Sequence, residues 1–269
     1  RIDWMSSGGA PLPVPIADAS SFGVIDADHA GRVSDFKEKP ANPPSMPSDP
    51  TRSYASMGNY LFNAKVLVQA LKEANERGEH DFGHHVLPKL KDTHRVFAYD
   101  FATNKVPGTK PYEEPAYWRD VGTRDAYFNA HQDLLGETPR FDMFNPQWRI
   151  FSSNYQGPVA RLMDAKIYNS VIAAGSMVRQ ATIVNTIIRR EVTIEDDVEI
   201  EDCLIQDYVH IKRGARLRRA IIGGYNVIEA GTRIGYDLEQ DRKLYEVTQG
   251  GITVVGPGEV TSAMRAFSE

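Results

Sequence analysis

The feature that most constrains the fold is a regular spacing of apolar residues in the C-terminal part of the chain. Steps of six, six and five residues from Val171 land on an aliphatic residue or a methionine every time. This spacing matches neither the period of an amphipathic helix nor that of a strand. The positions are Val171, Met177, Ile183, Ile188, Ile194, Ile200, Ile205, Ile211, Leu217, Ile222, Ile228 and Ile234.

A chain that winds round a triangular prism explains this spacing. Three steps add up to 17 residues, so each apolar side chain stacks on the residue 17 positions later, as Ile183 does under Ile200. Each coil lies about 4.8 Å above the last and contacts only its neighbours. The sequence therefore predicts a parallel β-helix of about four coils over residues 166–269. The segment resembles the hexapeptide repeat family, whose prisms are left-handed.

The same 17-residue register gives a meaning to the basic run "KRGARLRR", Lys212–Arg219. An acidic residue precedes each of its basic residues by 17 positions, which predicts a ladder of ion pairs between coils, each contributing about 0–1 kcal/mol. A binding site for a phosphorylated effector and a nucleic-acid patch are the alternatives. The expected pairs are Glu195 with Lys212, Asp196 with Arg213, Glu199 with Arg216, Glu201 with Arg218 and Asp202 with Arg219.

The N-terminal half alternates strand and helix signals. Residues 22–39 read as a hairpin, and residues 54–62 and 95–101 read as strands. Helices are expected to begin after the capping residues Asn63 and Thr123 and to end near Gly78 and Gly136. We therefore predict an α/β domain over residues 1–139 with a flexible glycine- and proline-rich N-terminal tail, and a linker over residues 140–165.

Composition narrows the function. The 36 acidic and 31 basic residues leave a net charge of −5, which argues against general attraction to nucleic acid or anionic membranes. A single cysteine, Cys203, excludes a disulfide framework and suits a reducing compartment. No apolar run approaches the roughly 18 residues of a membrane span. We expect a cytoplasmic protein with no membrane or nucleic-acid partner.

Polar residues at the predicted strand ends are the candidates for chemistry, because ligands bind beyond the carboxyl ends of strands in α/β sheets. Lys39 suits a phosphate, Glu38 and Ser56 suit sugar hydroxyls, and Asp120 before a Val-Gly-Thr turn suits Mg²⁺. Pro40 is expected to hold the backbone of Lys39 extended. Taken singly, each of these residues is more typical of an ordinary surface.

Four histidines crowd one segment, and two of them have the i, i+4 spacing of metal ligands. A zinc site also needs a third ligand and supporting hydrogen bonds, which the segment does not offer, so the sequence favours no zinc. The four are His80, His84, His85 and His94.

Six segments in this order resemble the bacterial glucose-1-phosphate adenylyltransferase family, from about Ser20 to Val260. They are "FGVIDAD", "FKEKPANPPSMP", "ASMGNYLF", "HDFG", "AYWRDVGT" and the terminal β-helix. The resemblance implies the C-terminal half of a Rossmann-like nucleotidyltransferase domain followed by a left-handed parallel β-helix. Members of this family convert ATP and glucose 1-phosphate into ADP-glucose and pyrophosphate for glycogen biosynthesis.

The resemblance also implies roles for particular residues. Lys39 would hold the phosphate of glucose 1-phosphate, and Asp120 would be one of two aspartates that hold Mg²⁺. The residues placed against the hexose are Gly23, Glu38, Ser56, Tyr60, Asp81 and Trp118. Anionic metabolite effectors would contact Arg216, Arg218, Arg219, Arg242 and Lys243. The family is allosteric and homotetrameric.

The chain departs from the family at its beginning. We find no glycine-rich loop with Arg and Lys to hold ATP, nor the first metal aspartate, so this polypeptide alone is expected to be inactive. The alternatives are a non-catalytic regulatory or assembly module and a nucleotidyltransferase that uses GTP, UTP or dTTP. A hexapeptide acyltransferase would need a catalytic histidine between coils, and His210 is the single histidine within the repeats.

Overall fold

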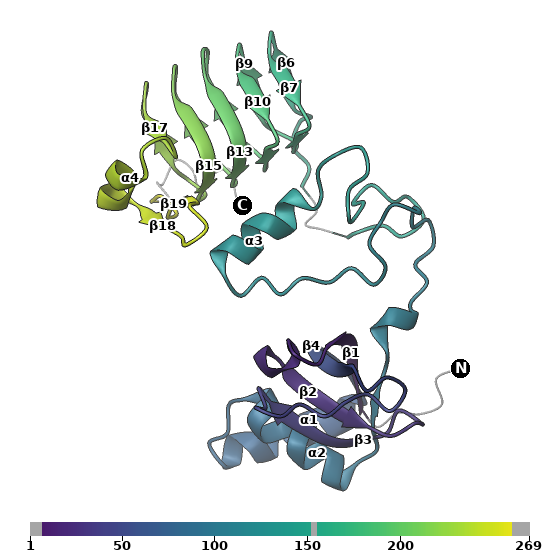
Figure 1. Ribbon diagram of the computed structural model, residues 1–269. Coiled ribbons are helices and arrows are strands. Elements are labelled where there is room, and N and C mark those ends of the chain that lie inside the picture. Colours follow the sequence, from purple (N-terminus) through teal and green to yellow (C-terminus); the bar gives the residue numbers. More distant parts are fainter. Residues whose placement is uncertain (1–6, 152–154, 260–269) are drawn as a thin grey trace. The chain divides into compact units, whose positions relative to one another are not determined.

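The computed structural model describes residues 7–151 and 155–259, and it divides into two compact units, Arg1–Val106 and Pro107–Glu269 (Figure 1). Each unit is described here by itself. No helix within these ranges combines the length and the apolar character that crossing a bilayer requires.

The first unit is an α/β layer built on a five-stranded sheet in the order β3-β2-β4-β1-β5. Its strands are β1 (Ser7–Pro15), β2 (Gly23–Ala27), β3 (Val33–Glu38), β4 (Arg52–Phe62) and β5 (Val96–Ala98). Its helices are α1 (Ala64–Glu76) and α2 (Leu87–Thr93), with short helical turns at η1 (Ala19–Ser21), η2 (Phe82–Val86) and η3 (Phe101–Thr103).

The predicted hairpin and the first predicted helix are confirmed. β2 and β3 pair antiparallel, with Gly23 opposite Glu38. Asn63 caps α1, its Oδ1 accepting a hydrogen bond from the Lys65 N–H at 3.0 Å. One core joins the sheet to the helices, and its buried members include Ile25, Phe36 and Leu90.

The prediction of a flexible N-terminal tail is wrong for residues 7–15, which form β1; residues 1–6 lie outside the described ranges. β1 pairs antiparallel with the long strand β4, and only Ser7–Gly9 also pair with β5. Beyond Gly9 the strand is an edge, where Pro11, Pro13 and Pro15 occupy alternate positions. Proline is tolerated there because alternate N–H groups point away from the partner strand.

The second unit contains α3 (Arg124–Gln132), the predicted β-helix, and α4 (Leu238–Leu244) near its C-terminal end (Figure 1). Thr123 caps α3 as expected, accepting from the Ala126 N–H at 3.1 Å. Fourteen strands complete the unit. They are β6 (Arg161–Met163), β7 (Lys166–Tyr168), β8 (Val171–Ile172), β9 (Met177–Arg179), β10 (Thr182–Val184), β11 (Ile187–Ile188), β12 (Thr193–Ile194), β13 (Glu199–Ile205), β14 (His210–Ile211), β15 (Arg216–Ile222), β16 (Val227–Ile228), β17 (Arg233–Ile234), β18 (Glu246–Val247) and β19 (Thr253–Val255).

The 17-residue register is confirmed from Ile183 onwards and is wrong in the first coil. Ile183 pairs with Ile200, and Ile200 with Leu217. In the first coil, however, Val178 lies opposite Ile194 and is fully buried, whereas Met177 is 40% exposed. Ile172 likewise replaces Val171 opposite Ile188. The side of the prism between Val178 and Ile183 is one residue shorter than the corresponding side of the next coils, so the first coil repeats after 16 residues.

The predicted charge ladder is confirmed at three of its five steps. Arg213 pairs with Asp196 at 2.7 Å, Arg218 with Glu201 at 3.4 Å, and Arg216 with Glu199. The other two steps are wrong. Lys212 reaches the following coil and pairs with Glu229 at 2.8 Å, and Arg219 donates to the Gly250 carbonyl at 3.0 Å.

Two buried residues of the β-helix unit have informative surroundings. Asp241 of α4 is buried and accepts from the Gly235 N–H at 2.7 Å and the Thr253 hydroxyl at 2.9 Å, which fixes α4 beside the last coil. Cys203 lies inside the prism, where burial raises the pKa of its thiol to about 12.

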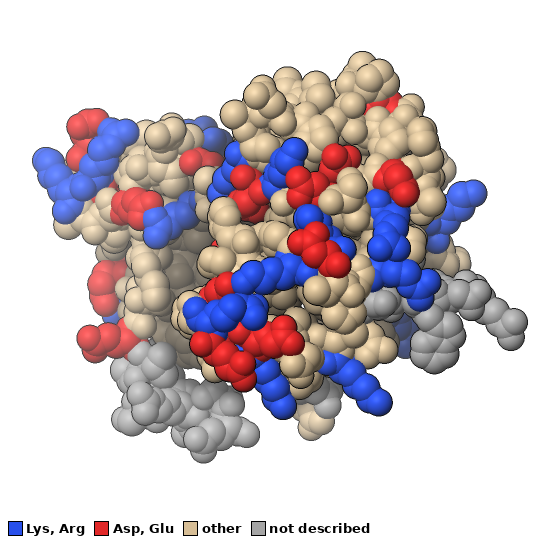
Figure 2. All heavy atoms as spheres, turned by 90° about the horizontal axis from the view of Figure 1, so that it is seen from below, with Lys and Arg blue, Asp and Glu red and all other residues tan. Residues whose placement is uncertain are grey.

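α3 lies along one side of the β-helix, so the segment before it is attached to that scaffold. Phe128 of α3 is buried against Ile187, Leu204 and Ile221. The Gln206 amide also donates to the Tyr127 hydroxyl at 3.2 Å. On the face of the molecule shown in Figure 2, acidic and basic side chains are interspersed rather than gathered by sign.

Candidate functional site

The end of the β2–β3 hairpin brings Gly23 against Glu38. Their strand register makes them direct neighbours, and a Cβ on Gly23 would lie 2.8 Å from Glu38 Oε2 and 2.9 Å from the Phe36 ring. Gly83 lies on another side of the same carboxylate, because a Cβ there would be 3.1 Å from Glu38 Oε2. The backbone of two segments therefore approaches Glu38 so closely that a residue without a Cβ is required at each of these positions.

Ser56, Tyr60 and Asp81 lie close to this carboxylate. The Ser56 and Tyr60 hydroxyls are 2.8 Å apart. Burial raises the pKa of Tyr60, and the negative charges of Glu38 and Asp81 act in the same direction. We call Gly23, Glu38, Ser56, Tyr60 and Asp81 the strand-end cluster. It contains five of the predicted site residues, brought together from β2, β3, β4 and the start of η2.

Asp81 is held by the helical turn that follows it. Its Oδ1 accepts from the His84 N–H at 2.7 Å, which makes it the cap of η2. This hydrogen bond is the main reason that the pKa of Asp81 is lowered, so the carboxylate is ionised at neutral pH.

Lys39 follows Glu38 directly, but its backbone is not extended as predicted. Its φ is +44°, in the left-handed region, and its N–H donates to the Phe22 carbonyl at 3.0 Å, which closes the end of the hairpin. The restriction by Pro40 is therefore overridden by the hairpin closure, at a local cost of about 1–3 kcal/mol. The Lys39 side chain is exposed, next to the strand-end cluster.

The other two predicted site residues, Trp118 and Asp120, belong to the second unit. They lie in the irregular segment that leads into α3. Asp120 is exposed, and its Oδ1 accepts from the Gly122 N–H at 2.9 Å, which shapes the turn before α3. Within residues 7–151 and 155–259 the other carboxylate oxygen has no hydrogen-bond partner, so Asp120 can offer it to a cation.

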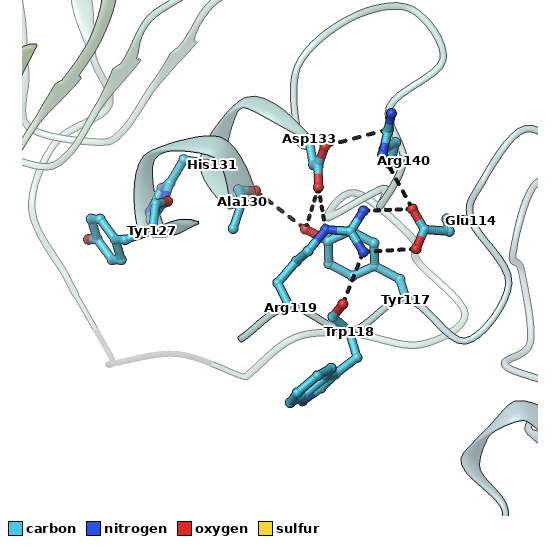
Figure 3. Close-up of polar contacts among 9 residues, drawn as sticks. All are labelled: Glu114, Tyr117, Trp118, Arg119, Tyr127, Ala130, His131, Asp133 and Arg140. Atoms are coloured by element: carbon cyan, nitrogen blue, oxygen red, sulfur yellow. Dashed lines mark hydrogen bonds and ion pairs between the residues drawn. The ribbon is translucent and has the colours of Figure 1, made fainter. Parts of the chain in front are cut away.

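Arg119, between these two residues, is the centre of a polar network that the sequence did not predict (Figure 3). Its guanidinium donates to both oxygens of Glu114, at 2.8 and 2.6 Å, and its Nε donates to Asp133 at 2.8 Å. The Tyr117 ring lies 4.4 Å from the guanidinium carbon, and the Tyr117 hydroxyl donates to Asp133 at 3.2 Å. The Trp118 indole points away from the network in Figure 3.

The charges in this network stabilise one another. Hydrogen bonds from Arg119 lower the pKa of Glu114 and in turn raise that of the guanidinium. Burial, reinforced by the negative charge of Asp133, raises the pKa of Tyr117 to about 12. At neutral pH the Arg119 cation therefore lies, partly buried, between the carboxylates of Glu114 and Asp133, and the Tyr117 phenol is neutral.

The predicted effector residues separate into two groups. Arg216 and Arg218 are committed to ladder pairs, and Arg219 to a backbone carbonyl. Arg242 and Lys243 line a pocket of about 400 Å³ together with Arg124. They too have protein partners, because Arg242 pairs with Glu239 and Lys243 donates to the Gln240 side-chain oxygen at 3.2 Å. Arg124 is ion-paired there with Glu246. This basic pocket was not predicted as a unit, because Arg124 lies more than a hundred positions earlier in the chain.

Among residues 7–151 and 155–259, no three His, Cys, Asp or Glu side chains are grouped so that they could hold a metal ion. His210 of the β-helix is 2.9 Å from Glu195 Oε1 and takes part in that pair.

Two family descriptions match the chain in succession. Nucleotidyl transferase matches residues 6–137, and the GlmU-like C-terminal hexapeptide region matches residues 159–255. These ranges coincide with the two kinds of architecture, the α/β layer with the segment through α3 and the β-helix.

Among curated proteins, the chain is similar to several bacterial glucose-1-phosphate adenylyltransferases. It is 47% identical to that of Thermodesulfovibrio yellowstonii over 91% of this chain and 60% of the relative. It is 40% identical to those of Corynebacterium jeikeium, over 93% of the chain and 63% of the relative, and Photobacterium profundum, over 92% and 62%. The chain thus spans about three fifths of the length of the curated relatives it matches.

Proposed function

We propose that the chain is the sugar-phosphate and β-helix part of a glucose-1-phosphate adenylyltransferase, because its residues 6–137 match the nucleotidyl transferase model and it is similar to such enzymes over nine tenths of its length. The reaction of the whole enzyme is ATP plus glucose 1-phosphate to ADP-glucose plus pyrophosphate, in glycogen biosynthesis. The observation that carries the proposal is the strand-end cluster, where polar groups from separate elements surround one carboxylate.

In this proposal the strand-end cluster binds the hexose of glucose 1-phosphate. Glu38 and Ser56 accept and donate hydrogen bonds to sugar hydroxyls, and the missing side chain at Gly23 allows the sugar to reach the backbone. Asp81 is ionised and fixed by its cap, so it presents acceptor oxygens in a defined direction. Tyr60 remains neutral and is held by Ser56. Trp118 belongs to the second unit, and its assignment to the sugar rests on the resemblance and on the apolar face that its ring offers.

Lys39 holds the phosphate in this proposal. The sugar phosphate is both substrate and nucleophile: one of its oxygens forms a bond to the α-phosphorus of ATP while the bond from that phosphorus to pyrophosphate breaks. The phosphate is already ionised at neutral pH, so no general base is required. The contribution of Lys39 is to orient the attacking oxygen and to offset its charge.

Asp120 is the residue of this chain that fits Mg²⁺. It is exposed, ionisable, and has one oxygen engaged by the Gly122 N–H, which leaves the other for a hard cation. A bound Mg²⁺ would supply charge neutralisation at the phosphates. Asp120 alone is not a complete magnesium site, which agrees with a family pattern of two aspartates.

The basic pocket of Arg124, Arg242 and Lys243 is proposed as the place where anionic metabolite effectors bind. Three cationic side chains there face one acidic side chain, Glu246. Arg216, Arg218 and Arg219 are already engaged by protein groups and contribute mainly to the β-helix.

We further propose a homotetramer in the cytoplasm. The support for assembly is the first coil of the β-helix, whose strands β6, β7 and β8 end their sheets and leave Val159, Leu162 and Tyr168 at least half exposed. Uncovered end coils and edge strands of this kind are usually capped or paired.

The test is a calorimetric titration of glucose 1-phosphate into the 269-residue chain. Lys39→Gln is expected to weaken binding about tenfold or more, because a charge-assisted contact to phosphate is lost. Lys37→Gln is the matched control: Lys37 lies two residues earlier, in β3, and pairs with Asp35 at 3.7 Å, so binding should not change. Absence of binding by the unaltered chain, or equal effects of both variants, would contradict the proposal.

A second measurement separates the enzyme proposal from the assembly-module alternative. With ATP and Mg²⁺ present, the 269-residue chain is expected to bind glucose 1-phosphate without forming ADP-glucose, because its sequence carries no glycine-rich phosphate loop. Oligomers that bind no sugar phosphate at all would favour a purely structural module.

A further inference from the structure

Arg119 lies in the sequence between the two proposed site residues Trp118 and Asp120. Its side chain points into the protein, while Trp118 points away from the network and Asp120 is exposed. The Tyr117 hydroxyl and the Arg119 guanidinium both donate to Asp133, whereas the Trp118 indole points away from that carboxylate (Figure 3).

The guanidinium is fixed at several points. It makes two parallel hydrogen bonds to Glu114, one to Asp133 and one, at 3.0 Å, to the carbonyl of Trp118. Only a planar guanidinium offers this set of directions, because an ammonium group cannot donate to both oxygens of one carboxylate and to a second carboxylate in one plane. The bond to the Trp118 carbonyl also fixes the peptide that joins Trp118 to Arg119.

The two carboxylates connect this segment to different supports. Glu114 lies five residues earlier in the same irregular stretch, so its bond closes a short loop. Asp133 follows directly after α3, and α3 is packed on the β-helix through Phe128. Arg119 therefore attaches an irregular segment to a helix whose own position is set by the β-helix.

We propose that Arg119 is a positioning residue for the nucleotidyl transfer reaction. Its clamp on Glu114 and Asp133 fixes the directions in which Trp118 and Asp120 project, although it contacts no substrate itself. This inference rests on the proposed function, because it takes Trp118 and Asp120 as the residues that meet sugar and cation.

Arg140 provides a matched control within the same network. Its guanidinium is 3.7 Å from Glu114 and 3.6 Å from Asp133, and its side chain is 66% exposed. It pairs with the same carboxylates but holds no carbonyl of the segment. Replacing Arg140 removes a charge from the network while leaving the clamp of Arg119 in place.

The experiment follows Trp118 by ¹⁹F NMR in the 269-residue chain labelled with 5-fluorotryptophan. The chain has three tryptophans, and Trp118→Phe assigns the signal. The variants are Arg119→Met, Arg119→Lys and Arg140→Gln, each checked for its melting temperature. Two readouts are taken: the position and width of the Trp118 signal without ligand, and its saturable shift on titration with glucose 1-phosphate.

In the expected result, Arg119→Met moves the free Trp118 signal towards that of the unfolded chain and weakens binding about tenfold or more, because the ring is no longer held in the binding direction. Arg119→Lys restores little of the Trp118 signal or of the binding, since a positive charge alone does not reproduce the hydrogen bonds of the planar guanidinium. Arg140→Gln leaves binding within about twofold of the unaltered chain, as expected for an exposed pair. A role limited to overall stability would change the melting temperature and not the two Trp118 readouts.

Two results would overturn the positioning role: an unchanged Trp118 signal in Arg119→Met, or full recovery of both readouts by Arg119→Lys. If the unaltered chain does not bind glucose 1-phosphate, the proposed function fails, and the ligand-free signal still decides whether Arg119 holds the segment. Failure of the function and failure of the clamp are therefore distinguishable.

Discussion

At the scale of single residues, absent side chains matter as much as those present. A Cβ on Gly23 or Gly83 would lie 2.8 or 3.1 Å from Glu38 Oε2, so this close approach of the backbone to the carboxylate requires glycine-like residues. The sequence alone identified Glu38 and Ser56 by their residue types, and the resemblance added Gly23. Neither pointed to Gly83, whose role depends on η2 folding back against the end of β3.

Gly23→Ala tests this arrangement. The added methyl would lie 2.8 Å from Glu38 Oε2 and 2.9 Å from the Phe36 ring, so one of them must move. We expect a loss of about 1–3 kcal/mol in the free energy of unfolding, measured with urea, and weaker glucose 1-phosphate binding. Gly256→Ala is the control, because no atom lies within 4 Å of the added Cβ. Equal stability of the two variants would contradict this description of the site.

The backbone of Lys39 illustrates where residue-level reasoning fails. Pro40 favours an extended conformation for the preceding residue, and that local rule is correct on average. Here the hydrogen bond from Lys39 to Phe22 closes the hairpin and holds φ at +44°. The competing interaction joins residues far apart in sequence, so no reading of the local sequence could weigh it.

At the scale of elements, strong periodicity made the β-helix predictable and long-range pairing made β1 unpredictable. From Ile183 to Ile234 the coils repeat after 17 residues, and the pattern alone gave the correct stacking there. β1 instead depends on β4, a strand about forty residues later, while its own glycines and prolines are typical of a loop. The Arg119 network likewise joins an irregular segment to the end of α3, which no spacing rule anticipates.

The corrected register of the first coil gives a sharp test. Val178 is fully buried and Met177 is 40% exposed, although the regular spacing assigned Met177 to the interior. Val178→Ala is expected to lower the free energy of unfolding by about 1–3 kcal/mol, because it leaves a cavity in a close-packed prism. Met177→Ala should cost less than about 1 kcal/mol. Chemical denaturation of both variants measures these two losses. A larger loss for Met177→Ala than for Val178→Ala would support the 17-residue register in this coil.

At the scale of the whole molecule, the titratable groups define a pH range of greatest stability. Hydrogen bonds and nearby cations lower the pKa values of carboxyl groups that include Asp81, Glu114 and Glu195. A depressed carboxyl pKa stabilises the folded chain above the unfolded value, 4.5 for Glu and 3.8 for Asp, and this stabilisation is lost as the pH falls through the folded values. Tyr117 and Cys203 have raised pKa values, so their contribution is lost as the pH rises above 10.0 and 9.0 respectively.

We therefore expect the free energy of unfolding to be nearly constant between about pH 5 and 8 and to fall on both sides. Urea titrations at a series of pH values measure this profile. Glu114→Gln should make the free energy of unfolding less dependent on pH on the acid side, because glutamine has no carboxyl group that takes up a proton on unfolding. An acid slope identical in the variant and the unaltered chain would show that Arg119 does not hold the carboxylate ionised.

The enclosure of Cys203 within the prism has a practical consequence for studying this protein. Its sulfur is fully buried and remains a protonated thiol at neutral pH, and it is the sole cysteine of the chain. Thiol-directed dyes and spin labels react with the thiolate, so we expect them not to label Cys203 in the native protein. A cysteine introduced at any exposed position can then carry a spectroscopic probe with no need to remove the natural one.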